Sequence, residues 1–326
     1  MKRKPYIIGI DLGGTAIKTG IVSFSGKLFH HETNPTNASA GRKTVLKNII
    51  AAVESTLTNS GITQKHIFGI GVGTPGLPNK NGTIITGAYN IPGWKGTPLG
   101  QVLRKKYHLP VRIENDVSAV TLGEATWGAG KGFKHIICIT LGTGLGGGII
   151  INKNLYRGES GYAGEFGHMV IAAGGEKCTS GVAGGFEAYS SAFAITRIAQ
   201  EKTKGKRISS ILKTALLPEN HPQQVKMIFQ AYQQGDRLAH SILQEFGYYL
   251  GIGIATLVNC FDPERVIISG GIAQSGQVLL SLMQPAYIAH LLPFHKKKKK
   301  IVLGKFDNRA GIIGAASLIM RQYTTP

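Results

Sequence analysis

The chain has 326 residues, of which 42% are apolar, and this length suits two globular domains with sizeable cores. Its 45 glycines cluster in short turns without a triplet period, which excludes a collagen-like protein. The formal net charge of +20 suggests nucleic-acid binding, but the basic residues are spread along the whole chain and form no basic helix. We therefore expect no nucleic-acid partner and interpret the lysine run 296–300 as a solvated loop.

Cysteine usage and the lengths of the apolar runs indicate a cytoplasmic protein. The three cysteines are an odd number at wide spacing, and Cys138 and Cys260 lie in apolar segments where a thiol packs as a small apolar group. The apolar run from Tyr6 ends at Asp11, which is too short for a signal peptide. The run 250–261 is far shorter than a membrane span, so we expect no membrane association.

The first part of the chain predicts strands followed by helices. Val45, Ile49 and Val53 repeat at helical spacing, and Asn or Asp within 114–116 is expected to cap a helix that runs towards Trp127. In chain order we expect three strands within 6–29, a helix at about 40–59, a strand at 66–72, a turn at 73–76, an irregular loop at 77–96, a helix ending at 108, a strand at 111–113 and a helix at about 116–127.

The second part begins after the glycine-rich stretch 128–132, which we interpret as a domain boundary. A long apolar helix is predicted at about 238–261, and a strand at 265–269 ends in a glycine pair. The other expected elements are strands at 136–141 and 148–151, a helical region at about 188–241 broken near Pro218 and Pro222, a strand at 301–303 and a last helix from about 309.

Two glycine-rich turns repeat one pattern. Asp11-Leu-Gly-Gly-Thr15 and Leu141-Gly-Thr-Gly-Leu-Gly-Gly148 each follow an apolar strand and lead into another strand. Glycines expose backbone N–H groups, which form an anion cradle that suits nucleotide phosphates. The second turn also matches G-x-G-x-x-G, but the chain continues as a strand instead of opening a helix, so a dinucleotide-binding Rossmann protein is disfavoured.

With five further motifs, these turns resemble the ROK family of sugar kinases and sugar-responsive repressors, within the actin, Hsp70 and hexokinase superfamily. The further motifs are Gly73-Thr-Pro-Gly76, Asn90-Ile-Pro-Gly-Trp94, Glu114-Asn-Asp116, Gly164-Glu-Phe-Gly-His168 and Ser269-Gly-Gly271. The resemblance runs nearly end to end. It implies a two-lobed α/β actin-like ATPase (ribonuclease H-like) fold, with duplicated lobes and a cleft between them. We expect a small lobe at 1–117, completed by the helix at about 309–326, and a large lobe at 118–308.

The resemblance also assigns the site. Asp116 matches the catalytic base, and the sugar-binding residues match Gly76, Asn90, Asn115, Asp116, Glu165, His168 and Glu187. The nucleotide-binding residues match Asp11, Gly13, Gly14, Thr15, Lys18, Gly142, Thr143, Gly144, Gly270 and Gly271. ATP and Mg²⁺ are the implied cofactors, with Asp11 holding the metal directly or through water. Carboxylates, an amide and an imidazole suit a pyranose, whose hydroxyls both donate and accept hydrogen bonds.

Several of these residues also have a purely structural interpretation. Asn115 and Asp116 suit helix caps, Glu187 suits a helix start, and Asn90 and Trp94 suit anchors of their own loop. Asp11 differs, because an unpaired carboxylate at the end of an apolar strand is costly, which favours a functional role.

A departure from the family concerns zinc. Many ROK proteins bind zinc through a histidine and three cysteines, and His168 and Cys178 match two of these ligands. Ser180 and Gly185 stand at the other two positions, so tetrahedral zinc is not supported. We expect a zinc-free protein in which His168 serves the sugar alone.

Several functions fit the resemblance. The first is an ATP-dependent hexose kinase that phosphorylates the 6-hydroxyl of glucose. N-acetylmannosamine, N-acetylglucosamine, fructose or allose are alternative acceptors, and polyphosphate is an alternative donor. A sugar-sensing regulator is disfavoured, because the first glycine turn begins at residue 11 and leaves no room for a preceding helix-turn-helix. Family members are often dimers, so we expect a homodimer.

Overall fold

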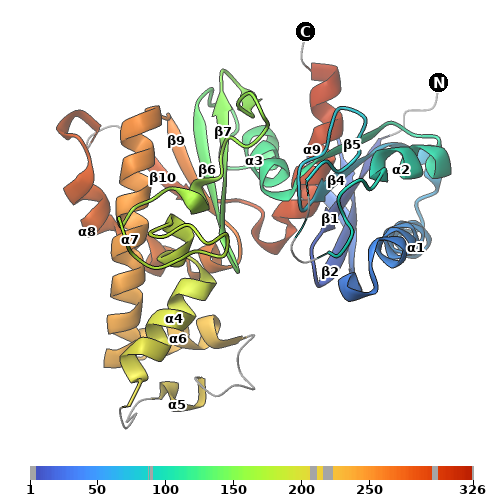
Figure 1. Ribbon diagram of the computed structural model, residues 1–326. Helices are drawn as coiled ribbons and strands as arrows, with labels where there is room; N and C mark the ends of the chain where they lie inside the picture. Colours follow the sequence, from blue (N-terminus) through green and yellow to red (C-terminus); the bar gives the residue numbers. More distant parts are fainter. Residues whose placement is uncertain are drawn as a thin grey trace. The chain divides into compact units, whose positions relative to one another are not determined.

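The computed structural model describes residues 5–86, 88, 91–205, 211–215, 223–295 and 300–324. The chain divides into two compact units (Figure 1). Unit 1 comprises Met1–Phe133, Ile150–Gly161 and Asn308–Pro326, and unit 2 comprises Lys134–Ile149 and Tyr162–Asp307. This division differs from a boundary at residue 117, because the helix that begins there packs along the C-terminal helix.

Unit 1 contains a five-stranded sheet in the order β3-β2-β1-β4-β5. Its strands are β1 (Tyr6–Leu12), β2 (Ala16–Ser23), β3 (Leu28–Pro35), β4 (Ile67–Thr74) and β5 (Val111–Asn115). The strands β1, β2 and β3 form antiparallel hairpins, whereas β1, β4 and β5 run parallel. The carboxyl ends of β1, β4 and β5 therefore meet at one edge of the sheet.

The two faces of this sheet carry different helices. Alternate residues Ile8 and Ile10 pack in one core with α1 (Arg42–Ser60) and α2 (Leu99–Tyr107). The other face receives α9 (Ala310–Thr324), which also packs along α3 (Asp116–Trp127). A Cβ at Gly9 would collide with the α9 backbone, so this glycine lets the helix lie close against β1. Asp11 follows in the same alternation and faces α9 as well.

A second five-stranded sheet has the order β10-β9-β6-β7-β8. Most of this sheet lies in unit 2, whereas β8 and the last residues of β7 fall in unit 1. Its strands are β6 (Ile136–Leu141), β7 (Leu145–Ile151), β8 (Asn154–Tyr156), β9 (Arg265–Ser269) and β10 (Lys300–Leu303). Read from β8 to β10, the order repeats that of the first sheet, with β6 in the place of β1. β6, β9 and β10 are parallel. The repeated order is the duplication that the sequence predicts.

Among the described residues of unit 2, the helices are α4 (Ala192–Thr203), α5 (Leu212–Ala215), α6 (Gln224–Gln233), α7 (Arg237–Phe261) and α8 (Gln277–His290). Gly247 and Gly251 of α7 let α8 approach closely, since a Cβ at either would meet the α8 backbone. The predicted breaks at Pro218 and Pro222 lie outside the described residues. Across the described ranges, no helix combines the length and the apolar character that a membrane crossing requires.

Candidate active site

The predicted site residues of unit 1 gather at the shared edge of its parallel strands. The register pairs Asp11 of β1 with Gly73 of β4, and Thr74 of β4 with Asn115 of β5. The Cα of Asp116 lies 3.5 Å from the position that a Cβ would take at Gly73. Asp11 and Asp116 therefore flank the end of β4, where an open α/β sheet commonly binds its ligand.

Asp11 is a largely enclosed carboxylate. Its side chain is 21% exposed, and its Oδ2 lies 3.8 Å from the Lys18 ammonium. Burial raises the pKa of Asp11 above its ordinary value, and the charge of Lys18 only partly opposes this. Gly311, in the first turn of α9, lies so close that any Cβ there would collide with the carboxylate. A positive charge beside Asp11 would therefore stabilise its ionised form.

The first glycine turn is held by a threonine from the end of β3. The Gly13 N–H donates to the Ala16 carbonyl at 2.9 Å, which closes the turn. Thr36 is fully buried; its Oγ1 donates to the Gly13 carbonyl at 2.7 Å, and its N–H donates to the Thr15 carbonyl at 3.0 Å. The backbone of the turn is thus fixed while Thr15 stays exposed.

Asn115 and Asp116 stand where β5 passes into α3. Asn115 is the N-cap, and its Oδ1 accepts the N–H groups of Val117 and Ser118, both at 3.1 Å. The Asn115 side-chain amide donates to Asp116 Oδ1 at 2.9 Å, and the Val117 N–H donates to the same oxygen at 2.9 Å. The capping interpretation of Asn115 is confirmed, and the same contacts orient the Asp116 carboxylate at the sheet edge.

The turn after β4 is anchored by Trp94. The Trp94 indole N–H donates to the buried Thr74 hydroxyl at 3.1 Å, and the ring is 1% exposed. Gly76 has a φ of 82°, a left-handed conformation that favours glycine. Asn90 lies outside the described residues. Trp94 thus acts as the loop anchor that one interpretation of the sequence expected.

The second and third glycine turns lie side by side in unit 2, since β6 and β9 are paired from Ile136 to Thr140. Gly270 has a φ of 94°, and a Cβ there would collide with the Leu141 carbonyl. The second turn is held by the start of α4, where the Ala192 N–H donates to the Gly142 carbonyl at 2.9 Å. Thr143 stays exposed, and Gly271 has open space beside it.

Glu187 stabilises the second glycine turn, although it lies 42 positions from Leu145 in the sequence. It is 7% exposed, and its Oε2 accepts the Leu145 N–H at 3.1 Å. Its Oε1 accepts the Thr179 hydroxyl at 2.5 Å and the Thr179 N–H at 3.3 Å. A Cβ at Gly144 would collide with the same carboxylate. Glu187 therefore links the second turn to the loop around Thr179.

His168 belongs to a polar cluster with Ser180 and Cys178. Its Nδ1 lies 3.1 Å from the Ser180 hydroxyl and 3.6 Å from the Cys178 thiol, and its Nε2 lies 3.7 Å from Glu165. Burial raises the pKa of the Cys178 thiol, but hydrogen bonds with Ser180 and His168 outweigh it and leave the pKa below its ordinary value. The cluster fixes the ring of His168 through its Nδ1 side.

Among these residues, the Asp11 carboxylate is the group that suits a metal ion. Within the part of the chain that the structure describes, no three His, Cys, Asp or Glu side chains converge as a metal site. Mg²⁺ in phosphotransferases is usually held by one or two carboxylates together with substrate phosphates. The enclosed Asp11 carboxylate, whose pKa burial raises, fits as one such ligand.

Sequence reasoning missed residues that hold the site from a distance. Glu114 is buried, and its Oε1 accepts the Asn115 N–H at 3.0 Å. Its Oε2 accepts the Nε–H of Arg157 at 3.0 Å as well as a second N–H of that guanidinium. Gly311, Thr36 and Thr179 were missed as well. The motif 114–116 already contained Glu114, but its partner lies 43 positions away and carries no local pattern.

Comparison with known proteins gives a consistent picture. The ROK family model matches residues 7–322. The glucokinase of Halalkalibacterium halodurans is 36% identical over 319 residues, covering 97% of this chain and 96% of that protein. The glucokinase of Thermotoga maritima is 35% identical, covering 97% and 98%. The crystal structure of a ROK family glucokinase from Streptomyces griseus with glucose and AMPPNP is 32% identical, with a TM-score of 0.82 and coverage of 96% and 98%.

Two sheets of one strand order, with glycine turns after β1, β6 and β9, define an α/β protein of the actin-like ATPase fold. The chain belongs to the ROK family. The predicted fold class and the predicted family are confirmed. The predicted site residues form two groups, one in each unit.

Proposed function

We propose that this protein is an ATP-dependent hexose kinase that transfers the γ-phosphate of ATP to the 6-hydroxyl of glucose. The observation that carries the proposal is the placement of Asp116 at the start of α3, where it is oriented by Asn115 and lies across the end of β4 from Asp11. The glucokinases of H. halodurans and T. maritima, similar over almost their whole length, support the same activity.

Asp116 acts as the general base. Its Oδ1 accepts two N–H groups, so the carboxylate is held in one orientation at the end of β5. Phosphoryl transfer depends mainly on alignment and electrostatic stabilisation, and the base takes the hydroxyl proton as the sugar oxygen attacks. Asn115 both orients this carboxylate and binds the sugar.

The glycine turns bind the nucleotide. Gly13, Gly14, Thr15 and Lys18 contribute in unit 1, and Gly142, Thr143, Gly144, Gly270 and Gly271 contribute in unit 2. The hydroxyls of the exposed Thr15 and Thr143 are suitable donors for phosphate oxygens. Asp11 would hold Mg²⁺ directly or through water, and when bound the metal neutralises charge on the transferring phosphate.

The family resemblance assigns hexose binding to glycine and polar residues. Gly76, Asn90 and Asn115 belong to unit 1, whereas Glu165, His168 and Glu187 belong to unit 2. His168 serves the sugar through Nε2, because its Nδ1 faces Ser180 and Cys178. Glu187 contributes through an oxygen that also holds the second turn. We further propose that the protein contains no structural zinc, works in the cytoplasm and forms a homodimer.

A panel of phosphoryl acceptors and donors tests the proposal. The purified protein is incubated with ATP, Mg²⁺ and, in turn, glucose, fructose, allose, N-acetylmannosamine and N-acetylglucosamine, with ADP release as the readout. We expect the highest kcat/KM with glucose. Polyphosphate in place of ATP tests the alternative donor. A chain that binds sugar but releases no ADP with any acceptor would instead be a sugar-sensing regulator.

A further inference from the structure

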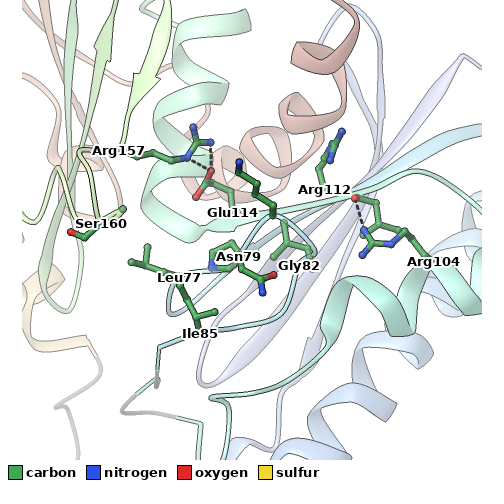
Figure 2. Close-up of a pocket in the computed structure, with 14 residues that line it drawn as sticks. Leu77, Asn79, Gly82, Ile85, Arg104, Arg112, Glu114, Arg157 and Ser160 are labelled. Atoms are coloured by element: carbon green, nitrogen blue, oxygen red, sulfur yellow. Dashed lines mark hydrogen bonds and ion pairs between the residues drawn. The ribbon is translucent and has the colours of Figure 1, made fainter.

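A pocket in unit 1 takes no part in the chemistry proposed above. It has a volume of about 350 Å³ and lies among the loop after β4, the strand β5 and the segment after β8 (Figure 2). All of the residues that line it belong to unit 1. Its volume falls within the roughly 300–1,000 Å³ of small-molecule sites, so it is large enough for a ligand and too small for a macromolecule.

The lining of the pocket is strongly basic. Lys80, Arg104, Arg112 and Arg157 line it, and Glu114 is the one acidic side chain among the described lining residues. Four positive charges against one negative charge leave an excess of three. Figure 2 shows Arg157 meeting Glu114 at one side of the pocket, with Arg104 and Arg112 at the other. A concave surface of one charge sign concentrates ions of the opposite sign.

Two of these arginines are held in place. The Arg104 guanidinium donates to the Val111 carbonyl at 3.2 Å and to the Asn81 carbonyl. Neutral carbonyls orient this cation without cancelling its charge. Arg157 is 53% exposed and is paired with the buried Glu114, so the single carboxylate is already neutralised. Because Glu114 is engaged with Arg157, it does not cancel the charge of Arg104 or of Lys80.

We propose that this pocket binds a small molecule that carries a dianionic phosphate group. The planar guanidinium groups of arginine match phosphate oxygens better than a point charge does. Asn79 and Ser160 add polar side chains, whereas Leu77 and Ile85 supply an apolar wall for the body of an ester. A sugar phosphate and free inorganic phosphate share this chemistry and are compared in the experiment.

The location of the pocket links it to the reaction. Glu114 shares its Oε2 with Arg157 and uses its Oε1 to hold the Asn115 N–H, next to Asp116. A phosphate that draws on Arg157 therefore acts on Glu114, which holds Asn115, and the Asn115 amide in turn donates to the candidate base Asp116. This consequence rests on the proposed function, whereas binding itself does not.

Calorimetry on the full chain tests the binding. Glucose and AMPPNP are added first to occupy the nucleotide and sugar sites, and inorganic phosphate and glucose 6-phosphate are then titrated in separate experiments. The variants are Lys80→Gln, an exposed loop side chain, and the double variant Lys80→Gln/Arg112→Gln. The matched control is Lys43→Gln/Lys65→Gln, which removes two exposed positive charges of unit 1 outside the pocket.

We expect one phosphate-bearing ligand per chain, with an affinity that falls about tenfold or more in the double variant, falls less in Lys80→Gln and is unchanged in the control. If glucose 6-phosphate binds more strongly than inorganic phosphate, the apolar wall of the pocket contacts the sugar part of the ester. If the two bind equally, the pocket recognises the phosphate group alone. Absence of binding to the wild-type protein, or equal binding to all variants, overturns the proposal. Because heat is measured without turnover, an inactive protein leaves this test intact.

Discussion

The first and second glycine turns each connect two consecutive strands, but the two turns differ in charge. Asp11-Leu-Gly-Gly-Thr15 ends β1 with a carboxylate, whereas Thr140-Leu-Gly-Thr-Gly144 ends β6 with a hydroxyl at the matching position. The first turn is held by the neutral Thr36 and presents Asp11, while the second is held by the carboxylate of Glu187, which is engaged with backbone N–H groups. The duplicated motif thus presents a carboxylate at the end of β1 in unit 1 and a neutral hydroxyl at the end of β6 in unit 2.

The difference predicts where mutations act. Asp11 and Asp116 lie at one sheet edge, so changes there should lower kcat. The second turn offers backbone donors held by Glu187, so changes there should act on stability and on binding.

Asp116→Asn should lower kcat by about 10²- to 10⁴-fold, because an amide cannot take the proton of the sugar hydroxyl. The amide keeps an oxygen that can accept the Val117 N–H, so folding should persist. ADP release under saturating glucose and ATP measures kcat. Glu159→Gln, an exposed carboxylate of unit 1, is the control and should keep wild-type turnover. A kcat for Asp116→Asn within tenfold of wild type would remove Asp116 from its role.

Asp11→Asn should lower kcat/KM for ATP by about 100-fold or more, since the charge that faces the metal and phosphates is lost. The matching change in unit 2, Thr140→Ala, should cost less than about tenfold, because a single neutral hydroxyl is removed. Initial rates over a range of ATP and Mg²⁺ concentrations compare the two. Equal losses at both positions would contradict the division between a charged turn and a neutral turn.

Glu187→Gln should destabilise unit 2 by about 1–3 kcal/mol, because the amide replaces an acceptor that faces the N–H of Leu145 or of Thr179. Urea unfolding followed by circular dichroism measures the change. Glu176→Gln alters an exposed carboxylate of the same loop and serves as the control. If Glu187→Gln unfolds at the wild-type midpoint, Glu187 does not fasten the second turn.

Glu32 of β3 should affect stability at low pH but not turnover. A hydrogen bond from Ser55 is the main cause that lowers the Glu32 pKa from 4.5 to about 2, with further hydrogen bonds from His30 and Asn59. This stabilisation is present above pH 4.5 and is lost as the pH falls towards 2. The urea midpoint of Glu32→Gln should therefore fall less steeply than that of the wild type as the pH is lowered. Parallel pH profiles for variant and wild type would show that these hydrogen bonds do not stabilise the fold.

Local patterns predicted much of the fold. Strand-turn-strand runs, the cap at Asn115 and the apolar run of α7 were each visible within a few residues. The helix α8 was not predicted, and Pro285 within it breaks the usual helical pattern. The strand β8 has three residues, which is too short for a periodicity to appear.

The contacts that shape the site were harder to foresee. Glu187 reaches Leu145 across 42 positions, and Glu114 reaches Arg157 across 43 positions. Such pairs depend on tertiary packing and leave no spacing rule in the sequence. Gly311 is a similar case, because only the approach of α9 to β1 reveals why a side chain cannot stand beside Asp11. Family resemblance identified the reacting groups, while the structure identified the groups that hold them.

Product analysis shows whether the protein phosphorylates the 6-hydroxyl of glucose. The wild-type protein is incubated with glucose, ATP and Mg²⁺, ADP is quantified, and the sugar product is identified by ³¹P and ¹H nuclear magnetic resonance. We predict glucose 6-phosphate in equal amount to ADP, with little ADP formed when glucose is left out. ADP formation that does not depend on the sugar, or phosphate on another hydroxyl, would contradict the assignment of a glucose 6-kinase.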